Sequence, residues 1–165
     1  MTTFEPDRRK VLMASGAALT IGLAGCTGNV DDDDDDDAEA PDPADDPEGF
    51  VEFYLDDWDA QLWDGSFEDL TGDDSVTIEN GANDPDYAMD PPAARISTGT
   101  TVTWEWVSDG HSLDEEDGNV DFDAESDVLD EGASHEVTFD EAGALVYYCT
   151  PHRGQGHWGG LIIEE

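Results

Sequence analysis

The segment 100–108, with the sequence TTVTWEWVS, alternates bulky apolar and polar side chains. Val102, Trp104 and Trp106 occupy one set of alternate positions, and threonine and glutamate side chains occupy the other. Successive side chains of a β-strand point to opposite faces, so this pattern predicts a strand with one face in a hydrophobic core. The alternation therefore favours a fold built from sheets over one built from helices.

Other segments repeat this pattern over shorter stretches. DSVTIEN, residues 74–80, predicts a strand, and GGLIIEE, residues 159–165, predicts a short terminal strand. SHEVTFDEAGALVYYCT, residues 134–150, predicts a hairpin with its turn at Asp140–Ala144. Helix signals are weak, and only residues 58–70 allow a helical turn. Many short strands with Gly, Pro and Asp turns predict an all-β fold, an antiparallel Greek-key β-sandwich.

Charge restricts the partners of this chain. Its 165 residues include 44 acidic and 5 basic side chains, which give a net charge of −39. Nucleic acid is therefore excluded as a partner, because its phosphates would be repelled. Such a surface suits concentrated salt, where the Debye length falls to about 3 Å at about 1 M. We expect the domain to lose folded structure when salt is removed.

The N-terminal segment has the features of an export signal. Arg8 and Arg9 precede an apolar run that is too short to span a bilayer of about 30 Å, and the run ends in Leu-Ala-Gly-Cys at Cys26. Paired arginines resemble a twin-arginine signal, and the end of the run resembles a lipobox in which Cys26 receives lipid. The alternative is an uncleaved N-terminal anchor helix. Both interpretations predict anchoring to the outer face of the cytoplasmic membrane.

These boundaries divide the chain into three parts. Residues 1–26 form the predicted signal with its lipobox. Residues 27–49 combine a run of aspartates with three prolines and no apolar periodicity, which predicts an acidic disordered linker. Residues 50–165 are long enough for one small sandwich core, but not for two domains.

A cysteine and two histidines lie within nine residues near the end of the chain, namely Cys149, His152 and His157. Cys26 is assigned to lipid, so Cys149 has no disulfide partner, and metal ligation is the commonest reason for an exported free thiol. A proline and glycines fold this loop back, which lets both imidazoles aim at the sulfur. His111, after the turn that follows the Trp-rich strand, reaches the same end. The four residues predict a mononuclear metal site, and the set also suits zinc.

From about Leu55 to Glu165 the chain resembles the halocyanins of halophilic archaea and, more broadly, the plastocyanin-like cupredoxins. The resemblance rests on AMDPPAARISTGTTVTWEW, DGHSL, HEVTFDEAGALVYYCTPH and GGLIIEE, which occur in the family's order. It implies one copper ion bound by His111, Cys149 and His152, and it implies outer-sphere electron transfer. His157 falls on the position of the family's weak axial methionine.

The histidine at position 157 is the main departure from the family. Imidazole is a harder donor than a thioether, so a bound His157 should stabilise Cu(II) and lower the reduction potential. Two alternatives remain open: His157 swings outward and leaves an open copper position, or the site holds zinc. Protonation of His157 near pH 6.5 is a further hypothesis, in which the site switches with pH.

Two residues near the ligands carry weaker predictions. Ser112 stands where the resemblance implies an asparagine that ties the ligand loops together, so we expect a weaker tether here. Pairing Val137 with Tyr147 across the predicted hairpin places His135 opposite Cys149, within reach of the sulfur. The alternative for His135 is a partly exposed histidine at the start of a strand.

The resemblance implies an electron carrier and not an enzyme. We expect a monomer, attached to the lipid bilayer through Cys26, that serves membrane-bound redox proteins of the respiratory chain. Electrons should leave through His152, and Trp158 either forms an apolar docking patch or packs over the site. The alternatives are a copper centre that binds or converts a small molecule and a metal-binding module, such as a zinc module, without redox work.

Overall fold

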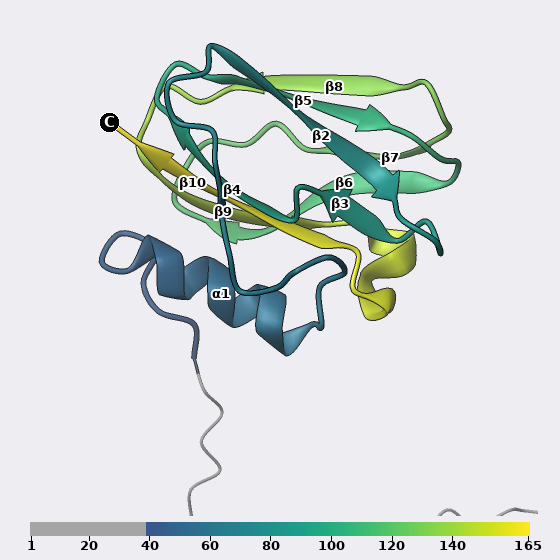
Figure 1. Cartoon of the computed structure of the whole chain (residues 1–165), viewed down its shortest axis with the longest axis horizontal. Coiled ribbons are helices and arrows are strands. Elements are labelled where there is room, and N and C mark those ends of the chain that lie inside the picture. Colours follow the sequence, from purple (N-terminus) through teal and green to yellow (C-terminus); the bar gives the residue numbers. More distant parts are fainter. Residues whose placement is uncertain (1–38) are drawn as a thin grey trace, which may run out of the picture. The chain divides into compact units, whose positions relative to one another are not determined.

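The computed structural model describes residues 39–165, which form two β-sheets packed face to face with a helix on the outside of one sheet (Figure 1). The predicted signal, its lipidation site Cys26 and residues 27–38 of the predicted linker lie outside the described residues. Among residues 39–165, no helix combines the length and the apolar character needed to cross a membrane.

Within this part of the chain, the secondary structure consists of an α-helix, a 3₁₀-helix and ten strands. In chain order they are α1 (Pro47–Asp57), β1 (Glu68–Asp69), β2 (Ser75–Ala82), β3 (Ala88–Asp90), β4 (Ala93–Ser97), β5 (Thr101–Trp106), β6 (His111–Gly118), β7 (Glu125–Leu129), β8 (Ser134–Thr138), β9 (Gly143–Tyr148), η1 (Thr150–Gln155) and β10 (Trp158–Glu164).

One sheet has the strand order β1-β4-β10-β9-β6-β7, and the other has the order β3-β2-β5-β8. The predicted all-β sandwich is confirmed, although some of its strand pairs are parallel where the sequence led us to expect antiparallel ones. β2 pairs with β5 in parallel, and β4 pairs in parallel with both β1 and β10. Alternation along a strand reports which side chains are buried, and it carries no information about the direction of the neighbouring strand.

The predicted hairpin over residues 134–150 is also wrong. β8 pairs with β5, with Trp104 opposite His135, whereas β9 pairs with β10 and β6 in the other sheet. The stretch between β8 and β9 therefore crosses from one sheet to the other, with Phe139 buried in the core beside the crossing. Two alternating segments joined by turn residues fit a hairpin and a crossing equally well.

Alternate residues of β9 belong to two separate hydrophobic cores, one between the two sheets and one under α1. Leu145 and Tyr147 pack between the two sheets, together with Trp104 and other inward side chains of β2, β4, β5 and β10. Ala144 and Val146 point to the outer face, where they pack against α1. The strand is therefore buried on both faces, which explains its almost continuous apolar sequence.

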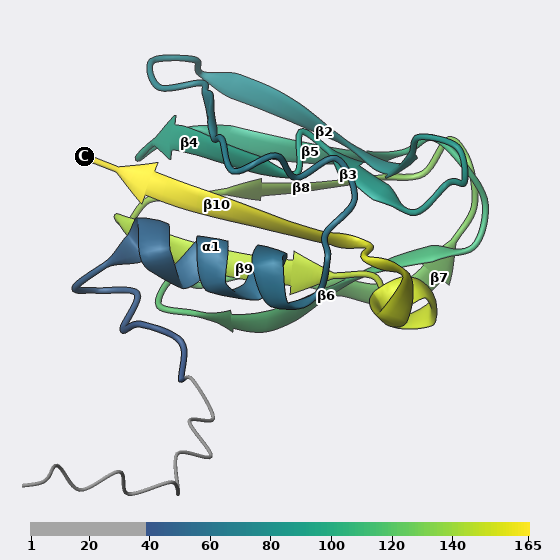
Figure 2. The same cartoon turned by 60° about the horizontal axis from the view of Figure 1, so that its bottom comes forward.

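The helix α1 was not predicted and begins three residues before the expected start of the domain. Asp46 caps it by accepting a hydrogen bond from the Gly49 backbone N–H at 3.0 Å, and Pro47 opens its first turn. The helix lies along β9 and β10 (Figure 2). It approaches β10 closely, because a Cβ atom at Gly160 would lie 2.4 Å from Cγ1 of Val51.

Candidate metal centre

The four predicted ligand residues meet at one end of the sandwich. His111 begins β6, Cys149 follows β9, His152 lies in η1 and His157 directly precedes β10. One donor atom from each side chain lies within 4.8 Å of the others. Strand ends and the η1 loop, which curls beside them in Figure 1, therefore bring together residues that are far apart in the sequence.

Three donors face one another closely. Nδ1 of His111 lies 3.1 Å from Nδ1 of His152, and Sγ of Cys149 lies 3.7 Å and 3.6 Å from these two nitrogens. Cys149 is fully buried, and burial raises the pKa of its thiol, an effect that the Ser112 N–H opposes. A sulfur and two imidazole nitrogens that converge in a buried space form a donor set that suits copper.

His157 completes the cluster from inside the protein. It is fully buried, and both of its ring nitrogens lack a hydrogen-bond partner among residues 39–165. Leaving such a buried group unpaired costs about 1–3 kcal/mol, which a bond to a metal ion would offset. Its ring lies 4.7 Å from that of His111. The residues present therefore fit a bound metal, and the alternative in which His157 swings into solvent does not agree with its burial.

Burial also determines the protonation of His157. Desolvation, with smaller contributions from His111 and His152, lowers the pKa of His157 to about 3. This burial argues against a switch near pH 6.5, because that hypothesis assumed a solvated histidine. The neutral ring keeps a lone pair available for a metal at ordinary pH.

Ser108 orients the ring of His111, and sequence reasoning missed it. The Ser108 hydroxyl donates to the Gly81 carbonyl oxygen at 2.7 Å and lies 2.9 Å from Nε2 of His111. Gly81 has φ +88°, and a Cβ atom there would lie 2.1 Å from the Ser108 oxygen and 2.6 Å from the His111 ring. Only glycine therefore allows this close packing.

Ser112 links the segment that carries His111 to the segment that carries Cys149 and His152. Its backbone N–H donates to Sγ of Cys149 at 3.4 Å, and its hydroxyl donates to Oδ2 of Asp114 at 2.6 Å. The same hydroxyl oxygen accepts from the Thr150 N–H at 3.0 Å, and the Thr150 hydroxyl donates to Oδ2 of Asp114 at 2.8 Å. A tether is thus present, built from a serine and an aspartate. Sequence reasoning missed Asp114 and Thr150, although Thr150 directly follows a predicted ligand.

For His135 and Trp158 the structure agrees with the second of the two expected alternatives: His135 is a partly exposed histidine at the start of a strand, and the Trp158 side chain is packed inside the protein. His135 is in the four-stranded sheet, and its Nε2 contacts the Asp123 carbonyl oxygen. The hairpin that placed it opposite Cys149 does not exist, so the argument for a contact with the sulfur is lost. Trp158 is fully buried against Trp58 and Tyr148, so it does not form a docking patch.

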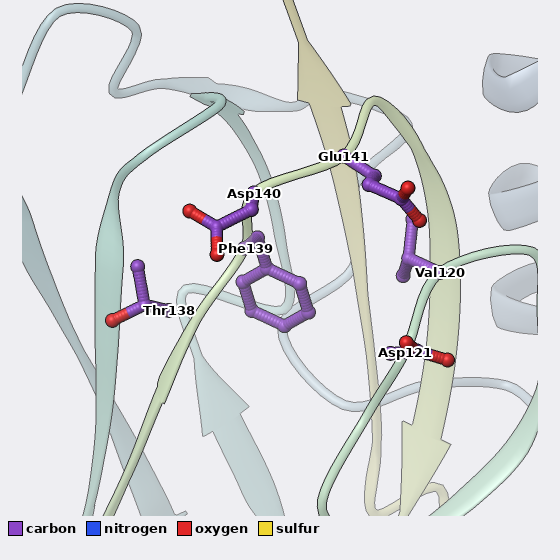
Figure 3. A pocket seen from close by; sticks show the side chains of 6 residues that line it. All are labelled: Val120, Asp121, Thr138, Phe139, Asp140 and Glu141. Carbon is purple, nitrogen blue, oxygen red and sulfur yellow. The ribbon is translucent and has the colours of Figure 1, made fainter.

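A hollow at the other end of the sandwich offers no comparable donor set. It lies where β8 crosses to β9, at the end of β9 opposite Cys149, and Phe139 contributes to its wall (Figure 3). Its lining residues are Val120, Asp121, Thr138, Phe139, Asp140 and Glu141. These side chains supply carboxylates but no thiol or imidazole, so the hollow lacks the donors that a copper site needs.

Known proteins are similar to this chain in sequence. The model of the copper binding proteins of the plastocyanin/azurin family matches residues 76–164. Halocyanin of Natronomonas pharaonis is 45% identical over 162 residues, which cover 96% of this chain and 98% of that protein. Plastocyanin of Scenedesmus fuscus is 29% identical over 99 residues, which cover 54% of this chain and 99% of that protein. A mutant plastocyanin of fern has a solved structure with a TM-score of 0.47 and 21% identity, covering 54% of this chain and all of that chain. On the family match and the halocyanin relative, the chain belongs to the plastocyanin/azurin family of copper-binding electron-transfer proteins.

Proposed function

We propose that this protein carries single electrons through a copper ion held by Cys149 and three histidines, with His157 as the fourth ligand. The observation that carries the proposal is the buried His157 ring, whose two nitrogens have no partner among residues 39–165 while three other donors face it. Copper held there would supply the redox chemistry, since thiolate favours Cu(I) and imidazole also accepts Cu(II).

The protein's own contribution is a frame that keeps the ligands in place. His111 is held by Ser108, Cys149 by the Ser112 N–H, and the ligand loop by the Thr150 contact to Ser112. Ser112 lies in β6, and Ser108 and Thr150 each lie two residues after the end of a strand. Small movement between oxidation states lowers the barrier to electron transfer, so a rigid frame is what this function requires.

His157→Met is the experiment that tests the proposed fourth ligand. The copper-loaded protein should absorb strongly in the visible, and the variant should have a higher reduction potential, because a thioether is the softer and weaker donor. Visible and electron paramagnetic resonance spectra of both proteins report the change in geometry. Equal potentials and spectra would contradict ligation by His157. A colourless protein with stoichiometric zinc, isolated from its native host, would contradict the redox function as a whole.

The enzyme alternative is tested on the same sample. A copper centre with an open position would bind azide or nitric oxide tightly. With His157 buried among the other donors, we expect neither ligand to change the visible spectrum. A saturable spectral change at low azide concentration would instead support an open site that binds small molecules.

The second part of the proposal concerns location and partners. The paired arginines and the lipobox support export, with lipid at Cys26 holding the domain on the outer face of the cytoplasmic membrane. There it would serve membrane-bound redox proteins of the respiratory chain. Cys26→Ser, expressed in the native host, should move the protein from the membrane fraction to the medium. Unchanged membrane retention of this variant would contradict the lipid anchor.

Electron exit is proposed at His152, the least buried of the four ligands. The ring of Tyr87 lies 4.5 Å from that of His152, so the two side chains lie together. In concentrated salt, docking there has to depend on apolar contact more than on charge. Tyr87→Ser should slow electron transfer to a membrane preparation and leave the potential unchanged. An unaltered transfer rate would contradict docking at this position.

A further inference from the structure

Basic side chains are scarce in the folded part of this chain, and both of them contact the region of α1. Between residues 39 and 165 the sequence contains only Arg95 and Arg153 as Lys or Arg. Arg95 forms ion pairs with Glu48 in α1 and with Glu164, the latter at 3.0 Å. The guanidinium of Arg153 lies 4.9 Å from the ring of Trp58, the C-cap residue of α1. The two arginines therefore fasten the two ends of one helix.

The Arg153 end of the helix adjoins the metal site. The Arg153 guanidinium also lies 4.5 Å from the ring of Tyr148 and 5.1 Å from that of Trp158. Its Nη2 donates to both carboxylate oxygens of Glu116 at 2.6 and 2.7 Å, and its carbonyl oxygen accepts from the Trp158 indole N–H at 2.8 Å. We call Arg153, Trp58, Tyr148 and Trp158 the Arg153 cluster.

Three of the four residues in the Arg153 cluster are sequence neighbours of the predicted ligands. Tyr148 precedes Cys149, Arg153 follows His152, and Trp158 follows His157. The ligands converge on one side of the backbone, while their neighbours converge on the other side under α1. A shift of the cluster should therefore shift the ligands, because each of these three residues is bonded directly to a ligand residue.

The turn after α1 makes a second connection to the same loop. The Gln61 backbone N–H donates to the Gly156 carbonyl oxygen at 2.8 Å, and its side-chain amide donates to the Gln155 carbonyl oxygen at 3.2 Å. Gly156 has φ +79°, and a Cβ atom there would lie 2.3 Å from the Asp59 carbonyl oxygen. The end of the ligand loop is thus packed tightly against residues that follow the helix.

We infer that Arg153 is a positioning residue for the metal centre, which fastens the ligand loop 150–157 to α1 through Trp58. A planar guanidinium stacks on several rings and pairs with a carboxylate at once, which lysine cannot do. The helix and Trp58 lie outside residues 76–164, the range that matches the family model. The frame of this copper site therefore includes a segment beyond the matched range. The inference rests on the copper site, and it is independent of the lipid anchor.

Arg153→Gln tests this role, with Arg95→Gln as the matched control at the other end of α1. In the metal-free protein, Arg153→Gln should speed amide hydrogen exchange in residues 150–157, and Arg95→Gln should leave it unchanged there. In the copper-loaded protein, Arg153→Gln should speed copper loss to a chelator by about 10–100-fold and shift the electron paramagnetic resonance spectrum. Arg153→Lys should restore neither property fully.

Two results would overturn the inference. One is an Arg153→Gln protein with normal exchange, spectrum and copper loss, and the other is an equal effect of Arg95→Gln, which would mean general destabilisation. If Arg153→Gln does not fold, Trp58→Leu removes the same contact from the helix side and should give the same changes; normal behaviour of that variant also overturns the inference. Hydrogen exchange needs no metal, so it remains decisive if copper binding itself fails.

Discussion

The hydroxyl oxygen of Ser108 lies 2.9 Å from Nε2 of His111, and its proton is already donated to the Gly81 carbonyl oxygen. A hydroxyl has one proton to donate, so Ser108 has to accept the hydrogen bond from Nε2–H of His111. This contact fixes the tautomer and leaves the lone pair on Nδ1, the atom that faces Cys149 and His152. A single side chain thus determines which nitrogen of His111 faces the metal site.

Ser108→Ala should remove this control of the tautomer. We expect copper retention to fall by about 10-fold, the lower end of the range for partners that orient metal ligands. Nitrogen NMR of the metal-free protein should show a mixture of His111 tautomers in place of one. Ser108→Thr keeps the hydroxyl and should behave like the unmodified protein. A single Nδ1 lone-pair tautomer in Ser108→Ala would contradict the prediction.

Ser112→Ala should loosen the joint between the two ligand loops. It removes the hydrogen bonds from the Thr150 N–H and to Asp114, each worth about 0.5–1.5 kcal/mol, so unfolding of the metal-free protein should become easier by about 1–3 kcal/mol. Thr150→Val is the control, because it removes only the exposed contact to Asp114 and should have a smaller effect. Urea unfolding in concentrated salt measures both. Equal effects of the two substitutions would contradict a central role for Ser112.

The sequence predicts which four side chains come together at this end of the sandwich, because few residues in the chain carry donors for a soft metal. Cys149, His152 and His157 share one short loop, and His111 follows the clearest strand, so few other donors were available. Ser108 escaped prediction because its role depends on Gly81 in β2, and parallel pairing of β2 with β5 brings this region close. Alternation alone does not determine strand partners, which is also why the hairpin with His135 was wrong.

The missed helix has a different cause. Asp46 and Pro47 are ordinary signals for a helix start, but they follow the acidic run and were counted with the predicted linker. The following segment has an apolar face, Phe50, Val51 and Leu55, which is buried against the outside of the sheet. Charge density therefore obscured a local pattern that was present in the sequence.

The free energy of unfolding of the metal-free protein should decrease as the pH is lowered, because His157 is buried in its uncharged form. The unfolded chain binds a proton at this histidine below about pH 6.5, whereas burial holds the pKa of the folded protein at about 3. The effect of His157 on the free energy of unfolding is therefore constant above about pH 6.5. Below this pH, the free energy of unfolding decreases by about 1.4 kcal/mol per pH unit as the pH falls toward 3.

The window from pH 6.5 to 5 isolates this effect, because most carboxylates titrate below it. Urea unfolding of the metal-free protein across this window should show the slope, and His157→Met should reduce it by about 1.4 kcal/mol per pH unit. Burial also lowers the pKa values of His111 and His152, so a smaller slope of the same sign should remain in the variant. Identical slopes for the two proteins would mean that His157 is solvated in the metal-free state.

Salt should stabilise the fold through screening of its own charge. With a net charge of −39, repulsion acts across the whole surface at about 0.1 M salt, where the Debye length is about 10 Å, and is largely screened at about 1 M. Salt also weakens the attractive pairs of Arg95 and Arg153, but exposed ion pairs contribute only about 0–1 kcal/mol each. Repulsion should therefore dominate, and circular dichroism of the metal-free protein should show loss of folded structure in dilute buffer.

Sucrose at equal osmolality does not screen charge, so it should restore less structure than potassium chloride. A spectrum that stays the same from molar salt to dilute buffer would show that packing of the two cores outweighs the repulsion.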